Sequence, residues 1–570
     1  MDEQIAVRFE HFTFQYYAQA EPTLHDINLE IRKHEKVLIV GPSGSGKSTL
    51  AHCINGLIPF AFKGKIEGKL ELDGQDTAGM NIFDRSIKVG TVLQDSDTQF
   101  VGLSVAEDIA FAMENDCVPQ EEMKRRVAEV GQIVGVDSIL GSEPSEISGG
   151  QKQRTTLAGV LVNHAEILLF DEPLANLDPA TGKTAIEIID TVHRTQNKTT
   201  IIIEHRLEDV LHRPVDRIIL MKEGRILADT DPHSLCASSL LVANGIREPL
   251  YLSALKRAGV KITADMQPGY MDTIRLPEDC VEQYRAWNER QAAPEAAPEG
   301  EELLRVEDVS FSYLGQKDNV SSVSFSLRKG EMIALIGRNG AGKSTLSKLV
   351  CGIARPDKGR ILCGGEDTAP MSIKEIADRI GFVMQNPNQM ISKAMIYDEV
   401  ALGLRYRGVP EEDIRPRVER ALKVCGLDEF IEWPISALSF GQKKRVTIAA
   451  ILVLEPSIMI LDEPTAGQDY KHYTEIMDFL EQINRLGITV ILVTHDMHLM
   501  QEYTSRAIVM NNSRLLASGR PSDILTNREL IESANLKETS LFTLCEKLGI
   551  QDASRFIQNF IDFERKERRK

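Results

Sequence analysis

The chain carries one ordered set of short motifs twice, at a nearly constant separation. A glycine-rich segment, an acidic pair and a histidine lie in that order at 41–48, 171–172 and 205, and again at 337–344, 462–463 and 495. A repeat of this kind indicates two copies of one folding unit. The 570 residues are enough for two domains of ordinary to large size.

The domain boundaries follow from the repeat and from composition. Residues 252–260 resemble residues 541–550, so each copy extends beyond its motifs. Residues 291–302 are rich in proline, alanine and acidic residues, which suits a tether rather than a core. We predict a first domain at 1–232 with an extension at 233–288, a linker at 289–302, and a second domain at 303–521 with an extension at 522–570.

Hydrophobic runs predict the fold class. Residues 36–40 and 332–336 are apolar, β-prone runs that lead into the glycine-rich segments. Residues 167–170 and 200–203 are continuously hydrophobic, which is typical of strands covered on both faces. The pattern predicts an α/β fold with a mainly parallel sheet in each copy.

Composition excludes several classes of protein. Hydrophobic residues make up 42% and charged residues 26% of the chain, the balance of a globular protein. No run approaches the ~18 apolar residues of a membrane-spanning helix, and the acidic first residues do not resemble a signal peptide, so we expect a cytoplasmic protein. The net charge of −18 argues against binding nucleic acid.

Both glycine-rich segments match the pattern G-x-x-x-x-G-K-[ST]. Its glycines let backbone N–H groups surround phosphates, its lysine adds a positive charge, and its hydroxyl binds Mg²⁺. Two matches, each after a predicted strand, are not explained by a chance glycine-rich turn. The segments predict ATP-binding residues at Gly41, Ser43, Gly44, Gly46, Lys47, Ser48 and Thr49, and at Gly337, Asn339, Gly340, Gly342, Lys343, Ser344 and Thr345.

An acidic pair ends a predicted buried strand in each copy. Asp171 and Asp462 are placed to hold Mg²⁺ together with Ser48 and Ser344. Glu172 and Glu463 are placed to act as general bases on the attacking water. Capping of a helix would explain one such pair, but not two at matched distances from two phosphate loops.

These motifs resemble those of the ATP-binding-cassette (ABC) ATPase family, and the resemblance covers nearly the whole chain. It implies two P-loop NTPase domains, each with an antiparallel β subdomain, a helical signature subdomain and a small C-terminal extension. It also implies further residues at the ATP site. These are the adenine-stacking Tyr16 and Tyr313, the metal-linked glutamines Gln94 and Gln385, the signature residues Ser148, Gly149, Gly150, Ser439 and Gly441, and the phosphate-sensing His205 and His495.

The two copies are not identical at the signature. Phe440 stands in the second copy where the first has Gly149. The family pairs its domains head-to-tail, so the resemblance implies that the two copies pair within this chain and that each signature closes the other copy's ATP site. We therefore expect two ATP sites of unequal activity.

Three kinds of soluble tandem-cassette protein fit this layout. The segments 94–101 and 385–390 resemble those of energy-coupling factor (ECF) transporter ATPases, and residues 245–251 resemble fused ATPases of thiamine or hydroxymethylpyrimidine import. This resemblance implies an importer of a vitamin or metal ion, with separate coupling and substrate-binding subunits in the membrane. The protein would then sit peripherally on the cytoplasmic face of the cell membrane.

A ribosome-associated translation factor is the alternative, although its group has a long basic linker where this chain has a short acidic one. Sugar-importer ATPases are a third option, but their second site is often degenerate.

Overall fold

Two sheets form in each half of the chain, and one of them contains strands that are buried along their whole length. In the computed structural model, residues 4–93, 99–163, 165–175, 177–291, 300–313 and 319–568 are described. The chain divides into two units, residues 1–287 with 469–471 and residues 288–468 with 472–570.

The first half contains a six-stranded and a four-stranded sheet. The six-stranded sheet has the order β10-β9-β3-β8-β7-β6, in which all neighbours are parallel except β9 and β10. The four-stranded sheet has the order β2-β1-β4-β5 and is antiparallel. The strands are β1 (Ile5–Tyr16), β2 (Leu24–Arg32), β3 (Lys36–Val40), β4 (Gly64–Leu72), β5 (Gln75–Asp76), β6 (Val89–Val92), β7 (Ile167–Asp171), β8 (Thr199–Ile203), β9 (Arg217–Lys222) and β10 (Arg225–Thr230).

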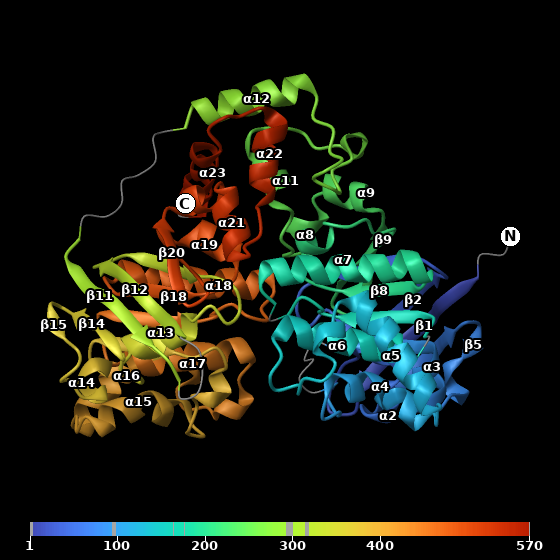
Figure 1. Ribbon diagram of the computed structural model, residues 1–570, viewed down its shortest axis with the longest axis horizontal. Coiled ribbons are helices and arrows are strands. Elements are labelled where there is room, and N and C mark those ends of the chain that lie inside the picture. The colour runs from blue at the N-terminus through green and yellow to red at the C-terminus, as the bar shows by residue number, and fades with distance from the viewer. Residues whose placement is uncertain are drawn as a thin grey trace. The chain divides into compact units, whose positions relative to one another are not determined.

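Most helices of the first half fall into three groups. Helices α4, α5 and α6 contact one another and lie together in Figure 1 as a helical subdomain. Helices α1 and α7 follow strands of the six-stranded sheet, and α9 to α12 follow its last strand. The helices are α1 (Lys47–Asn55), α2 (Leu57–Phe60), α3 (Ile82–Lys88), α4 (Val105–Asn115), α5 (Gln120–Val134), α6 (Gly149–Leu161), α7 (Pro179–Gln196), α8 (Leu207–Val210), α9 (Pro232–Ala237), α10 (Leu240–Ala243), α11 (Leu250–Arg257) and α12 (Glu278–Glu289).

The second half repeats this arrangement of strands. Its six-stranded sheet has the order β16-β17-β18-β13-β19-β20, and its four-stranded sheet the order β12-β11-β14-β15. The strands are β11 (Glu302–Phe311), β12 (Val320–Arg328), β13 (Met332–Ile336), β14 (Lys358–Cys363), β15 (Glu366–Asp367), β16 (Ile380–Val383), β17 (Ile458–Asp462), β18 (Thr489–Val493), β19 (Arg506–Asn511) and β20 (Arg514–Gly519).

The helices of the second half also correspond to those of the first. Helices α15, α16 and α17 contact one another as α4, α5 and α6 do. The helices are α13 (Lys343–Val350), α14 (Ile373–Ala377), α15 (Ile396–Tyr406), α16 (Glu411–Val424), α17 (Phe440–Leu452), α18 (Tyr470–Arg485), α19 (Met497–Tyr503), α20 (Pro521–Leu525), α21 (Arg528–Ala534), α22 (Ser540–Leu548) and α23 (Ala553–Arg568).

The buried strands explain the position of the motifs. Strands β3 and β13 are buried at all five positions, so each runs through the hydrophobic core of its half. Parallel strands end at the same edge of a sheet, where α/β proteins bind their ligands. The predicted α/β fold, with its antiparallel β and helical subdomains, is confirmed. Within the described ranges, no helix is both long and apolar enough to span a membrane.

Candidate functional site

The predicted phosphate-binding loops end at the first turns of helices α1 and α13. The residue before each helix, Gly46 or Gly342, has a positive φ of 96° or 99°. A Cβ atom on Gly342 would also lie 2.3 Å from the backbone oxygen of Asn319, so only glycine fits there. Each helix therefore presents its first N–H groups and its positive dipole end to the loop, as anion binding requires.

The two loop lysines contact the backbone of their own loops. Lys47 Nζ donates hydrogen bonds to the carbonyl oxygens of Gly41 and Pro42, at 2.8 and 3.0 Å. Lys343 Nζ donates in the same way to Gly337, at 2.6 Å, and to the next residue. Burial lowers the pKa of Lys47. A phosphate group entering the loop would give these ammonium groups a charged acceptor.

A serine hydroxyl and an aspartate meet beside each loop. The distance between Ser48 Oγ and Asp171 Oδ1 is 3.4 Å, and that between Ser344 Oγ and Asp462 Oδ2 is 3.3 Å. Among the described residues, no cluster of three or more His, Cys, Asp or Glu side chains could hold a metal ion. A hydroxyl and a carboxylate are the hard oxygen ligands that Mg²⁺ uses together with water and nucleotide phosphates, so the residues fit that ion.

Burial changes the ionisation of the aspartates. It raises the pKa of Asp171 to about 6, and the charge of the neighbouring Glu172 raises it further. Burial also raises the pKa of Asp462. A cation bound beside these groups would favour their ionised forms.

The two glutamates after these aspartates have a strained backbone. Glu172 and Glu463 have φ values of 49° and 45°, in the left-handed region that non-glycine residues rarely adopt. Hydrogen bonds hold them there, because Glu172 N donates to Ile203 O at 2.9 Å and Glu463 N donates to Val493 O at 2.8 Å. Such strain is concentrated at functional sites. The sequence analysis did not predict it.

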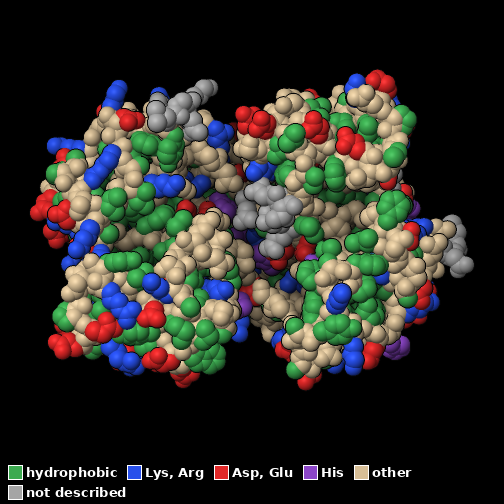
Figure 2. Space-filling view, turned by 90° about the horizontal axis from the view of Figure 1, so that it is seen from below, with side chains coloured by type: hydrophobic (Ala, Val, Ile, Leu, Met, Phe, Trp, Pro, Cys, Tyr) green, Lys and Arg blue, Asp and Glu red, His purple; other side chains and the backbone are tan. Residues whose placement is uncertain are grey.

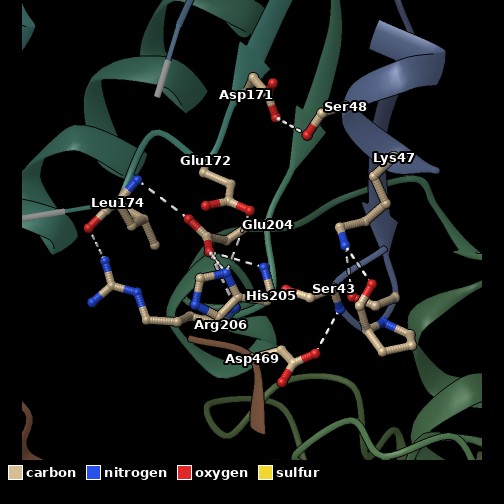
Figure 3. A network of polar contacts seen from close by, with 12 residues as sticks. Ser43, Lys47, Ser48, Asp171, Glu172, Leu174, Glu204, His205, Arg206 and Asp469 are labelled. Atoms are coloured by element: carbon tan, nitrogen blue, oxygen red, sulfur yellow. Dashed lines mark hydrogen bonds and ion pairs between the residues drawn. The ribbon is translucent and has the colours of Figure 1, made fainter. Parts of the chain in front are cut away.

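The histidines contact carboxylates in both halves, but in different ways. His495 Nδ1 lies 2.7 Å from Glu463 Oε1. His205 Nδ1 lies 3.9 Å from Glu172 Oε1 and 3.2 Å from Oε1 of its neighbour Glu204. Figure 3 shows Glu204 between the Glu172 carboxylate and the imidazole ring.

The remaining predicted residues belong to several different elements. Tyr16 bonds through its hydroxyl to Thr49 Oγ1 at 3.2 Å, whereas Tyr313 is partly exposed beside Phe311. Ser148 and Ser439 cap helices α6 and α17, and each forms a capping box with the glutamine three residues later. Gly149, Gly150 and Gly441 lie in the first turns of these helices.

One of the two predicted glutamines can be placed. Gln94 lies outside the described residues, whereas Gln385 follows β16 and is exposed. The backbone oxygen of Gln385 accepts a hydrogen bond from Lys444 Nζ at 2.7 Å, and that amine also donates to Glu463 O at 3.1 Å. Burial lowers the pKa of Lys444 to about 8.

Sequence reasoning missed both Lys444 and Glu204. The only available signal was their position. Lys444 lies two residues after the signature glutamine, and Glu204 directly precedes His205 where the second copy has Thr494.

Comparison with known proteins identifies the family. A family model described as "ABC transporter" matches residues 24–175 and 320–466, over half of the chain. A protein named as an ABC transporter ATP-binding protein, from Clostridium perfringens (strain 13 / Type A), is 54% identical over 99% of both chains. The chain belongs to the ABC transporter ATPase family. The predicted identity of this ATPase as a tandem ABC protein is thereby confirmed.

A second family model and further proteins also match this ATPase. A model described as "ATP-binding cassette cobalt transporter" matches residues 238–311, which overlap the predicted C-terminal extension at 233–288. A second relative, an ABC transporter ATP-binding protein of Enterococcus faecalis (strain ATCC 700802 / V583), is 54% identical over 99% of both chains. A solved structure from Clostridium perfringens, titled as cbiO1 and part of the ABC transporter complex cbiONQ, is 37% identical, covers 43% of this chain and 100% of its own, and has a TM-score of 0.39.

The raised pKa of Asp171 predicts a pH-dependent stability effect. Between the ordinary pKa of 3.8 and the folded-state value of about 6, the folded protein binds more protons than the unfolded chain, so stability falls as pH rises. Above pH ~6 the ionised, buried carboxylate therefore destabilises the nucleotide-free protein by about 3 kcal/mol. We expect Asp171→Asn to stabilise the nucleotide-free ATPase by about this amount at pH 7.5, and by only about 1 kcal/mol at pH 4.5. Urea unfolding at the two pH values measures the difference, and a variant no more stable than the parent at pH 7.5 would contradict it.

Proposed function

We propose that the protein is the ATP-hydrolysing subunit of an ECF-type importer that takes up a vitamin, a vitamin precursor or a transition-metal ion. Supporting this are the ECF-like segments 94–101 and 385–390, the thiamine-type segment 245–251, and the match of residues 238–311 to a model described as a cobalt transporter. The protein would act peripherally at the cytoplasmic face of the membrane. Its partners would be a coupling subunit and a substrate-binding subunit.

The proposed chemistry is the same in both halves. The loop of residues 41–48 or 337–344 holds the phosphates of ATP, and Glu172 or Glu463 accepts a proton from the attacking water. Mg²⁺ held by Ser48 and Asp171, or by Ser344 and Asp462, would neutralise phosphate charge. The observation that carries the proposal is that each half contains the loop, the serine, the aspartate and the glutamate. The hydroxyl–carboxylate distances in the two halves are 3.4 and 3.3 Å.

Exposed hydrophobic residues support a partner surface in the first half. Val101 ends the ECF-like segment 94–101, and Leu103 lies two residues further on. Their side chains are 61% and 82% exposed. Leu103 and the capping residue Ser104 donate backbone hydrogen bonds to Glu107, so the exposed side chains lie on a fixed turn before α4. Figure 2 views the side on which α2 and α4 lie in Figure 1, and hydrophobic side chains gather on that face of the first half. A helix of a membrane subunit could dock there by its apolar face.

The equivalent residues of the second half favour a different interpretation. Met390 and Ile391 pack against the hydrophobic core of the helical subdomain, and Met390 Sδ accepts a hydrogen bond from Met384 N at 3.1 Å. From the sequence, Met390 could either line a docking groove beside Gln385 or pack the helical subdomain. Its packing makes a structural role the better account, so the test below uses the first half.

A ribosomal role is the remaining alternative. The net charge of −18 and the acidic linker disfavour an RNA partner, since phosphates attract basic surfaces. Co-sedimentation with ribosomes, and no membrane protein co-purifying, would favour this alternative.

The first prediction of the proposal concerns the general bases. Changing Glu172 and Glu463 together to Gln should lower ATP hydrolysis by at least ~100-fold, because proton abstraction is lost while the phosphate contacts remain. Steady-state release of phosphate measures this. The single variants serve as controls, and a double variant with undiminished turnover would contradict the assignment.

The second prediction concerns coupling to the membrane partner. Val101→Asp and Leu103→Asp should abolish uptake by the transporter reconstituted with its membrane subunits, because a charge would enter an apolar contact. ATP hydrolysis and thermal unfolding of the isolated ATPase should stay within about twofold and about 1 kcal/mol of the parent, as is usual for exposed sites.

The matched control for this test is Val242→Asp. Val242 in α10 is 61% exposed, the same as Val101, so a change there introduces the same charge at an equally exposed valine. Uptake that is normal in Val101→Asp and Leu103→Asp would exclude this surface as the docking site.

A further inference from the structure

Glu204 is a buried carboxylate beside the ATP site that no motif assigns. Its side chain is 0% exposed. Oε1 accepts hydrogen bonds from the backbone N–H groups of His205 and Arg206, at 2.8 and 3.2 Å. Oε2 accepts one from Leu174 N at 3.2 Å. Burying a carboxylate is costly unless such donors replace water, so a residue of this kind needs an explanation.

The same carboxylate contacts the ring of His205. The distance from His205 Nδ1 to Glu204 Oε1 is 3.2 Å, and that to Glu172 Oε1 is 3.9 Å. Both contacts are at ion-pair distance, and the shorter one is to Glu204. A carboxylate beside one ring nitrogen favours one orientation of a histidine ring.

The segment after Glu172 is held by the same group of residues. Leu174 gives its N–H to Glu204 and receives a hydrogen bond at its carbonyl oxygen from Arg206 Nη2. Both backbone polar groups of Leu174 are thus bound by the residues that flank His205, as Figure 3 shows. The position of the Glu172 segment and the orientation of the histidine are therefore linked.

The second half supplies an internal comparison. Thr494 occupies the position of Glu204, and its hydroxyl donates to Glu463 Oε2 at 3.3 Å. His495 Nδ1 lies 2.7 Å from Glu463 Oε1, so both residues contact the glutamate directly. The repeated fold therefore accommodates a threonine at this position.

We propose that Glu204 is a positioning residue for ATP hydrolysis in the first half, which contacts His205 at Nδ1 and keeps the ring off the Glu172 carboxylate. The inference rests on the proposed function, in which water oxygen bonds to the γ-phosphorus, the bond to the β-phosphate oxygen breaks and the water proton goes to Glu172. With the ring of His205 beside Glu204, Glu172 accepts that proton without first losing a hydrogen bond from His205. In the second half, Glu463 first has to lose its hydrogen bond with His495.

A double-mutant cycle with His205 tests the proposal. In the otherwise unchanged chain, Glu204→Thr should reduce kcat by half or more and change KM for ATP less than twofold, because the nucleotide contacts are untouched. In a His205→Ala chain, Glu204→Thr should cause a clearly smaller loss of kcat, since the contact with the ring is absent and only the hydrogen bond to Leu174 N is lost. Equal losses in both chains, or an unchanged kcat in the first, would overturn the proposal.

Two further measurements keep the test decisive. Glu204→Gln keeps the volume and one acceptor oxygen, so it replaces Glu204→Thr in the cycle if the threonine variant does not fold. Thermal unfolding of each variant identifies a purely structural effect, which would lower stability and reduce kcat equally with and without His205. Failure of the proposed function would appear separately, as continued hydrolysis when both Glu172 and Glu463 are Gln.

Discussion

Parallel pairing of two buried strands positions the chemistry in each half. Asp171 on β7 pairs with Ile203 on β8, and Asp462 on β17 pairs with Val493 on β18. The residues that follow both strands therefore meet at one edge of the sheet. The hydrogen bond from Glu172 N to Ile203 O holds the glutamate in its left-handed conformation, and Glu463 is held in the same way. A change in this register would separate each glutamate from its histidine.

The two halves share these strand pairings but differ in their buried polar contacts. The first half has Glu204 beside its histidine, whereas the second has Thr494. In the second half, Lys444 is 1% exposed and donates hydrogen bonds to the backbone carbonyls of Gln385 and Glu463. The first half has Gln153 after its signature, which donates to the carbonyl of Pro173. Both halves keep the residues proposed to react and differ in those that hold them, which provides a physical reason to expect unequal sites.

Local sequence patterns were sufficient to predict the buried strands but not these polar contacts. The runs at 36–40 and 332–336 coincide with β3 and β13 because continuous hydrophobicity and burial on both faces go together. Glu204 and Lys444 belong to residue types that are usually exposed, and only tertiary packing shows that they are buried. Met390 packs against the core of the helical subdomain, and no local signal distinguishes such a methionine from one that faces a partner.

The central claim is that one chain contains two complete ATP sites. The most direct test is the stoichiometry of ATP binding, measured by equilibrium dialysis with Mg²⁺ under conditions where hydrolysis is blocked by Glu172→Gln and Glu463→Gln. The account predicts two ATP molecules per chain, falling to one when Lys47 or Lys343 is also replaced by Ala. A single ATP per chain in the hydrolysis-blocked variant would contradict it.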